Sequence, residues 1–169
     1  PDADEPDEAL DAWPDYLEHL SDTLAPGAFV GDVAAVADLD AVRQDAWPEV
    51  LGLIAGTPEL RRALVGPVID EHGRRAASYT SWWLRTRGPV TGPFRLGGGT
   101  GWMPPAPALL AGLDDEVLAA LGAVRVVELD LPGWVRLLDA MPVGGPVEPD
   151  DAVAAWRALA ALPADAPGD

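Results

Sequence analysis

Four glycines lie within five residues in the stretch FRLGGGTGWMPPAP, which runs from Phe94 to Pro107. Because backbone N–H groups of glycine-rich loops can hold phosphates, residues 97–101 are the first candidate for a nucleotide site. A P-loop also needs a Lys-Ser/Thr pair, and a dinucleotide fingerprint needs G-x-G-x-x-G between a strand and a helix. Here Pro104 and Pro105 follow shortly after, and Pro-Pro cannot open a helix whose N-terminus would bind an anion. We therefore interpret the glycine stretch as a connector.

The segment SYTSWWLRTRG, residues 78–88, places arginines beside tryptophans. Tyr79, Trp82 and Trp83 follow one another at i, i+3 and i+4, which predicts that they share the buried face of a helix. The alternative is a surface that combines arginines with aromatic rings and binds an acidic partner, or the acidic N-terminal stretch of the same chain. The residues of this candidate partner surface are Arg74, Arg75, Trp82, Arg85 and Arg87.

Other catalytic chemistry finds little support in the residue types. Cysteine is absent, and the two histidines, His19 and His72, lie far apart and are predicted to be solvated side chains. The acidic runs LDDE and EPDD each precede an apolar segment, where acids cap a helix and complement its dipole. No serine stands in a G-x-S-x-G setting. We predict no catalytic, cofactor-binding or metal-binding residue, and we do not expect this segment to be an enzyme.

The charge of the chain restricts its partners. It carries a formal net charge of −17 at pH 7, from 28 acidic residues and 11 basic ones. All the basic residues are arginine, so the chain has neither the lysine of a P-loop nor a lysine that could form a Schiff base with a substrate. Such a charge disfavours nucleic acid and anionic membranes. Residues 59–95 hold seven of the arginines, however, so a winged-helix-like nucleic-acid-binding module remains an alternative, with Arg61, Arg62, Arg74 and Arg75 on one side.

Several helices can be predicted from local patterns. A tryptophan is followed by apolar residues at +3, +4 and +7 at Trp13, Trp47 and Trp134, which places each set on one helix face. The motif DAWP at the first two positions predicts Asp11 and Asp45 as N-caps, with proline in the first turn. Further predicted helices cover residues 58–64, 79–86 with Ser78 as N-cap, 115–121 ended by Gly122, and 150–161.

Strand signals are fewer. The segment GPVIDEHGRRAAS predicts a small antiparallel hairpin with a turn that ends in Gly73. AFVGDVAAVADL, residues 28–39, and VRVVEL, residues 124–129, are further strand candidates. The fold class is therefore α+β, a mainly helical domain with a small antiparallel β-hairpin or sheet.

The predicted organisation is one domain between two linkers. Residues 1–8 form an acidic linker, residues 9–162 a single domain, and residues 163–169 a second linker. The domain can also be divided into a helical part, 9–64, and a hairpin-plus-helices part, 65–162. The N-terminus is acidic and no run of 18 apolar residues exists, so we expect a cytoplasmic protein. Because the chain starts at Pro1, we expect it to be a piece of a longer one.

Three phrases resemble a known family: VAAVADLDAVRQDAWPEVLGLIAG, SYTSWWLRTRG and LLAGLDDEVLAALGAV. They are similar to the internal region of large high-GC bacterial proteins that carry a sacsin-like, Hsp90-type ATPase domain at their N-terminus. The resemblance runs from residue 33 to residue 162, and YTxWWLR is its most specific part. It implies a large cytoplasmic, chaperone-like ATPase whose ATP is bound by a separate domain. The ATP-site motifs of that domain do not stand in this sequence, so no catalytic residue is carried over.

The resulting functional prediction is a non-catalytic scaffold or interaction module of such an ATPase. Its partners would be other domains of the same long chain and client proteins. The segment itself would bind no cofactor, nucleic acid or membrane. The alternatives are a stand-alone enzyme with a pocket near residues 97–101 and the winged-helix-like module described above.

Overall fold

The computed structural model describes residues 10–28, 31, 33–90, 92–96, 104–124, 131, 134, 135, 138 and 149–161. Contacts between residues divide the chain into two compact units. The first unit takes residues 1–92 and 107–121, and the second takes residues 93–106 and 122–169. The alternative boundary between residues 64 and 65 therefore falls inside the first unit. The two predicted linkers and the glycine stretch 97–101 lie outside the described residues.

The first unit contains five of the predicted helices, with nearly the same ends where ends were predicted. They are α1 (Trp13–Thr23), α2 (Trp47–Gly56), α3 (Pro58–Val65), α4 (Tyr79–Thr86) and α5 (Asp115–Ala120). Short 3-10 helices cover Leu39–Ala41, Gln44–Ala46 and Ala108–Leu110. The capping predictions hold for α4 and α5. The Ser78 hydroxyl accepts the N–H of Ser81 at 3.1 Å, and the Asp114 carboxylate accepts the N–H groups of Glu116 and Val117 at 3.1 and 3.2 Å.

The predicted N-caps of α1 and α2 are wrong. Both helices begin after an alanine, Ala12 or Ala46, that makes no side-chain cap. Asp11 instead accepts a hydrogen bond from a distant tryptophan, and Asp45 lies in a 3-10 helix and pairs with Arg43 at 3.5 Å. The physical reason is the proline in the first turn of each helix, which lacks one of the N–H groups that a capping carboxylate would hold.

The buried face of α1 also differs from the predicted one. Tyr16 and Leu20 are buried as expected, but Leu17 is 48% exposed. The buried residues follow one another at a spacing of four, and the row continues through Ala12 and Leu24. Leu17, at one edge of the predicted apolar face, therefore lies toward solvent. In α2 the predicted face is confirmed for three of its residues, which are buried: Trp47, Leu51 and Ile54.

The predicted hairpin is confirmed. Strand β1 (Val68–Ile69) pairs antiparallel with β2 (Arg75–Ala76), with Val68 opposite Ala76 and Ile69 opposite Arg75. Gly73 ends the turn with φ +80°, a backbone conformation that favours glycine. The strand candidate at residues 28–39 is wrong for residues 33–38, which form no strand; there the N–H of Val36 reaches the Thr80 hydroxyl at 3.0 Å instead of a neighbouring strand.

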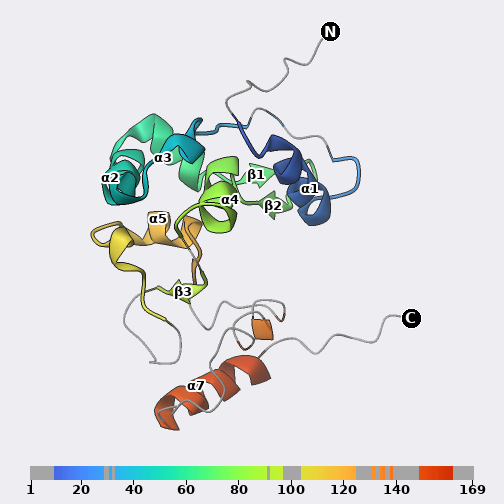
Figure 1. The fold of residues 1–169 in the computed structure, drawn as a ribbon. Coiled ribbons are helices and arrows are strands. Elements are labelled where there is room, and N and C mark those ends of the chain that lie inside the picture. The colour runs from blue at the N-terminus through green and yellow to red at the C-terminus, as the bar shows by residue number, and fades with distance from the viewer. Residues whose placement is uncertain are drawn as a thin grey trace. The chain divides into compact units, whose positions relative to one another are not determined.

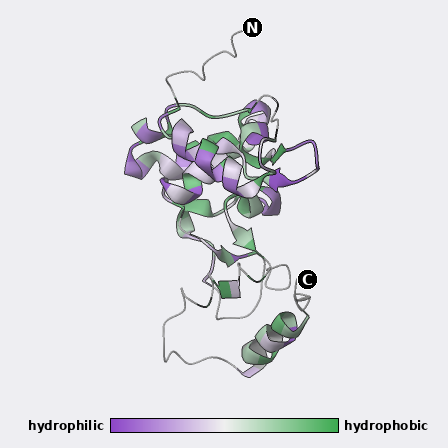
Figure 2. Cartoon of the chain, turned by 90° about the vertical axis from the view of Figure 1, so that its right-hand side faces the viewer, coloured by the Kyte–Doolittle hydropathy of each residue, from purple (hydrophilic) through white to green (hydrophobic). Residues whose placement is uncertain are grey.

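The second unit contains a parallel strand pair that the sequence did not predict. Strand β3 (Phe94–Arg95) pairs with β4 (Ala123–Val124), and helix α7 (Pro149–Ala160) follows. Of the strand candidate 124–129 only the first residue lies in β4, and the rest lies outside the described residues. Phe94 and Trp134 are buried. Figure 2 draws the ribbon of α7 mostly in green and pale colours, which mark hydrophobic and intermediate residues, and its Trp156 is 73% exposed.

The architecture is thus mainly helical α+β, as predicted. In the first unit α4 lies between α3 on one side and α1 with the hairpin on the other (Figure 1). Helix α3 also packs against α2 and α5. This position makes α4 the central helix of its unit and accounts for its buried row Tyr79, Trp83 and Leu84. None of the described helices is long and apolar enough to cross a membrane.

Candidate functional site

The candidate partner surface begins where α4 meets α1. The rings of Tyr16 and Tyr79 pack edge to face, with centroids 5.4 Å apart at an interplanar angle of 87°. Trp82 lies 5.3 Å from Tyr16, and Trp13 lies 5.9 Å from Tyr79. Such tilted and edge-to-face contacts are the arrangements that aromatic pairs prefer. The aromatic residues of α4 therefore serve mainly to hold α1.

Acidic residues at the start of α1 complete this contact. The carboxylate of Asp11 accepts the indole N–H of Trp83 at 2.7 Å and the hydroxyl of Tyr79 at 3.3 Å. Burial raises the pKa of Tyr79 to about 12, so this hydroxyl is a donor at neutral pH. Asp15 pairs with Arg87. Of the candidate partner surface, Arg87 is thus bound by an acid of the N-terminal stretch that the sequence analysis named as one occupant. The other two residues bound by this stretch, Tyr79 and Trp83, do not belong to that surface.

His19 belongs to this contact as well. Its ring stacks on Trp82, with centroids 6.2 Å apart and an interplanar angle of 24°. Its Nε2 atom is buried and has no hydrogen-bond partner among the described residues. Burial lowers the pKa of His19, the charge of Arg85 lowers it further, and Asp22 opposes both. The prediction of a solvated His19 is wrong, because the ring lies on the side of α1 that faces α4; His72, in the hairpin turn, is exposed as predicted.

The structure distributes the predicted surface residues over two elements. Trp82 is half-buried, and Arg85 and Arg87 are exposed at the end of α4. Arg74 and Arg75 are exposed on the hairpin, where Arg75 stands opposite Ile69 in the ladder. Of these five residues, Trp82 and Arg87 are engaged by α1 in the contacts described above.

Arg61 has a structural role. Its guanidinium binds both carboxylate oxygens of Asp114, at 2.7 and 3.0 Å, and one oxygen of Glu116 at 2.5 Å. These hydrogen bonds raise the pKa of Arg61 and lower that of Asp114 to about 2. They join α3 to the N-terminus of α5. The winged-helix-like alternative needs Arg61 for phosphate, whereas here two carboxylates hold it.

Three other arginines of the same region lack such partners. Arg62, Arg74 and Arg75 form no ion pair in the part of the chain that the structure describes. Two acidic residues, Asp70 and Glu71, precede the hairpin arginines in the turn, and the carboxylate of Asp70 is engaged by backbone groups. Asp70 is 5% exposed and accepts the N–H groups of Ala25, His72 and Arg74 at 3.1, 2.9 and 2.8 Å.

These three bonds decide the charge state of Asp70. Burial alone would raise its pKa, but the backbone N–H groups outweigh that effect and the pKa is lowered. The carboxylate is therefore charged at neutral pH and fixes both the hairpin turn and the loop that follows α1. Sequence analysis missed this role. An aspartate three residues before the glycine of a tight turn is the local signal that could have indicated it.

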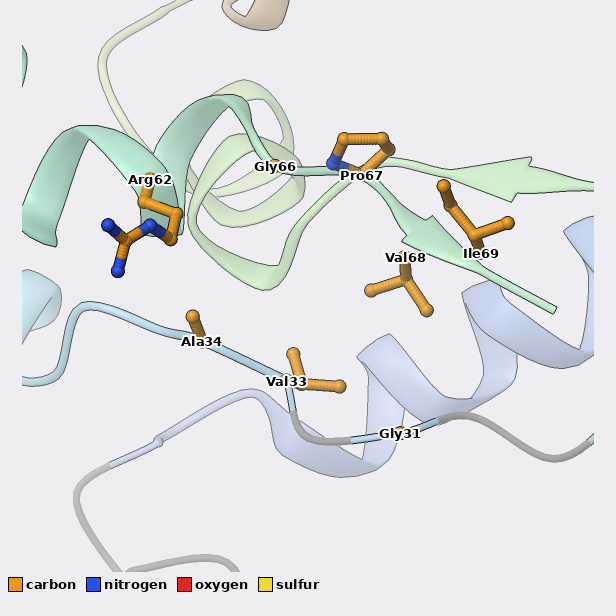
Figure 3. A pocket seen from close by; sticks show the side chains of 8 residues that line it. All are labelled: Gly31, Val33, Ala34, Arg62, Gly66, Pro67, Val68 and Ile69. Atoms are coloured by element: carbon orange, nitrogen blue, oxygen red, sulfur yellow. The ribbon is translucent and has the colours of Figure 1, made fainter.

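A pocket of about 350 Å³ lies beside the hairpin. Its walls come from Gly31, Val33 and Ala34 on one side and residues 66–69 on the other, and Arg62 stands at one end (Figure 3). Val33 and Val68 point toward the same space (Figure 3). Sequence analysis did not predict this pocket, because its two walls are about thirty residues apart in the chain. The described residues include no group of three or more acidic, histidine or cysteine side chains that could hold a metal ion.

No protein-family model, curated protein or solved structure matches this chain.

Proposed function

We propose that this chain is a non-catalytic interaction module of a larger cytoplasmic, sacsin-like, Hsp90-type ATPase with a chaperone-like function. In this proposal the hairpin side of the first unit docks an acidic segment of another domain of the same long chain. The family setting rests on the resemblance of three sequence phrases. ATP would bind to the separate N-terminal domain, and closure of that domain would change how strongly the docked segment is held.

One observation carries the docking proposal. In a chain of net charge −17, the arginines Arg62, Arg74 and Arg75 have no carboxylate partner among the described residues, while Arg61 and Arg87 have theirs. In the hairpin turn, the carboxylate of Asp70 is bound by backbone N–H groups and not by these arginines, and that of Glu71 lies 3.8 Å from His72. Exposed cations without partners complement an acidic surface and speed its encounter.

The first experiment measures the mass of the natural protein with an antibody raised against this segment. A mass far above the 17.7 kDa of the present chain is expected. The second experiment compares hydrogen exchange of the amides of β1 and β2 in the natural protein and in the isolated chain. Docking should slow exchange in the natural protein, and added salt should weaken that protection because the contact is electrostatic.

A charge-reversed variant makes the test specific. Arg74→Glu combined with Arg75→Glu should abolish the added protection, whereas Arg43→Glu should leave it intact, because Arg43 lies outside the hairpin in an exposed pair with Asp45. Arg87→Glu is a poorer test, since it would also set two acids against each other at Asp15. A natural mass near 17.7 kDa, or protection that survives the double reversal, would refute the proposal.

A further inference from the structure

The two faces of the hairpin differ in composition. In the ladder Val68 stands opposite Ala76, and both are buried, whereas the next pair, Ile69 and Arg75, is exposed. Figure 3 shows that the side chains of Val68 and Ile69 point to opposite sides of β1. A strand with one buried face usually carries polar residues on the other face, yet Ile69 is 49% exposed. The outer face of the hairpin therefore presents an apolar side chain and a cation together.

The register brings these two side chains close to each other. The N–H of Asp70 donates to the carbonyl of Arg74 at 3.1 Å, so Asp70 and Arg74 form a hydrogen-bonded pair of the ladder. Hydrogen-bonded and non-hydrogen-bonded pairs alternate, so Ile69 and Arg75 form a non-hydrogen-bonded pair. The side chains of such a pair are the closest in a sheet, with Cβ atoms about 5 Å apart. A group that binds the guanidinium of Arg75 therefore lies within reach of Ile69.

Both hairpin arginines are accessible to an acidic ligand. Arg74 and Arg75 are exposed and form no ion pair with any residue that the structure describes. The nearby carboxylate of Asp70 is bound by backbone N–H groups instead. Guanidinium groups bind carboxylates through charge-assisted hydrogen bonds. A ligand for this face therefore needs carboxylates for the arginines and an apolar group for Ile69.

An acidic segment meets both needs only if its apolar group lies on the same side as its acids. Segments rich in like charges repel themselves and stay extended. In an extended chain, side chains two residues apart point to the same side, about 7 Å from each other, whereas adjacent side chains point to opposite sides. An apolar residue two positions from an acid can therefore cover Ile69 while the acid binds Arg75, and removing Ile69 from water favours the contact.

We propose that the acidic segment docked at Arg74 and Arg75 carries a bulky apolar residue two positions from an acid. The apolar side chain covers Ile69, and the acid on the same side of the segment binds Arg75. This inference rests on the proposed docking of an acidic segment and specifies which segments dock. The arginines recognise charge, and Ile69 selects among acidic segments.

The test uses the whole 169-residue chain labelled with ¹⁵N, with NMR detection of the amide shifts of β1 and β2. Three blocked peptides of equal charge serve as probes. The first, acetyl-Ser-Leu-Ser-Glu-Ser-Glu-Ser-Glu-amide, places leucine two positions from a glutamate. The second has serine in place of leucine. The third, acetyl-Ser-Ser-Leu-Glu-Ser-Glu-Ser-Glu-amide, has the composition of the first but places leucine next to a glutamate. The first should bind at least about fivefold more tightly than the other two, because only its leucine lies on the same side as the carboxylates.

Variants of the chain separate the apolar contact from the charged one. Ile69→Thr keeps a β-branched side chain, which strands favour, and should bring the affinity for the first peptide down to that for the second. Leu53→Gln removes a more exposed apolar side chain from α2 and should change no affinity. Arg74→Gln combined with Arg75→Gln should weaken the binding of all three peptides. All four side chains are exposed, so these changes should leave the chain folded.

The outcomes distinguish this inference from the docking proposal. Equal affinities of the three peptides, all lost in the double arginine variant, would leave the docking proposal intact and overturn the choice of segment. So would a third peptide that binds as tightly as the first, or an Ile69→Thr variant that binds as the parent chain does. If no peptide binds at millimolar concentration, the hairpin arginines do not dock acidic segments and both proposals are wrong. Binding of phosphatidylserine vesicles in place of the peptides would also overturn both, because the surface would then serve a membrane.

Discussion

The contact between Asp11 and α4 predicts a large effect for a single exposed carboxylate. Substitution Asp11→Ala removes the acceptor of the Trp83 indole N–H, now bonded at 2.7 Å, and of the Tyr79 hydroxyl, bonded at 3.3 Å. Trp83 is 4% exposed, so its N–H would be left buried without a partner. Such an orphaned donor costs about 1–3 kcal/mol, and the longer bond to Tyr79 adds less. We expect the free energy of unfolding to fall by about 2–3 kcal/mol.

The assay is urea unfolding followed by tryptophan fluorescence, with a shifted midpoint and an unchanged dependence on urea concentration. Asp11→Asn keeps a carbonyl oxygen as acceptor and should lose less than about 1 kcal/mol. Glu18→Ala, which removes an exposed acid of α1, is the control and should stay within about 0.5 kcal/mol of the parent chain. If the alanine variant is as stable as the parent, or the asparagine variant is as damaged as the alanine variant, the hydrogen-bond explanation is wrong.

Three further predictions concern pH and packing. Burial lowers the pKa of His19 from 6.5, so the unfolded chain takes up the proton first and the free energy of unfolding should fall as the pH drops below 6.5. In urea titrations at several pH values, His19→Gln should remove this dependence on pH. A variant that keeps the pH dependence of the parent chain would show that His19 is not its cause. Hydrogen bonds from Arg61 lower the pKa of Asp114 from 3.8 to about 2, so the stability that this carboxylate contributes is full above pH 3.8 and is lost as the pH falls to about 2. The loss is under about 1 kcal/mol because the pair is exposed, and Asp114→Asn should cancel it. If the variant loses stability between pH 3.8 and 2 as the parent does, the prediction is wrong. Gly88→Ala should destabilise the protein by about 1–3 kcal/mol, since a new Cβ would lie 2.8 Å from the α4 backbone. Gly52→Ala, inside α2, should stabilise it by up to about 1 kcal/mol, because nothing lies within 4 Å of the new Cβ. Melting temperatures that shift in the same direction for both variants would refute these two predictions.

Much of the local structure could be predicted because short-range physics decides it. The Ser78 hydroxyl caps α4 within one turn, and Gly73 ends the hairpin at a positive φ that few other residues adopt. The apolar spacing from Trp47 sets the buried face of α2. Each of these features depends on residues within one or two turns of each other, which a sequence displays directly.

The candidate site depends on contacts that no local pattern contains. Asp11 was predicted to cap its own helix, but its partner Trp83 lies 72 residues further along the chain. The arginine–aromatic segment of α4 was predicted as a candidate surface, yet its residue types alone could not distinguish an external acidic partner from α1. The pairing of β3 with β4 joins two segments that lie 29 residues apart, Phe94 opposite Ala123 and Arg95 opposite Val124, and no local pattern specifies that pairing.

The path of the chain between its two units has a consequence for how the protein is made. The first unit resumes only at residue 107, after the chain has contributed residues 93–106 to the second. Its late portion supplies the fully buried Val117 and Leu121, and the carbonyl of Ala120 accepts the Ser81 hydroxyl at 2.5 Å. During synthesis the first unit therefore stays unfinished until residue 121 has left the ribosome. No single proteolytic cut separates the two units cleanly, because a cut after residue 121 leaves residues 93–106 on the first unit and a cut before residue 93 leaves residues 107–121 on the second.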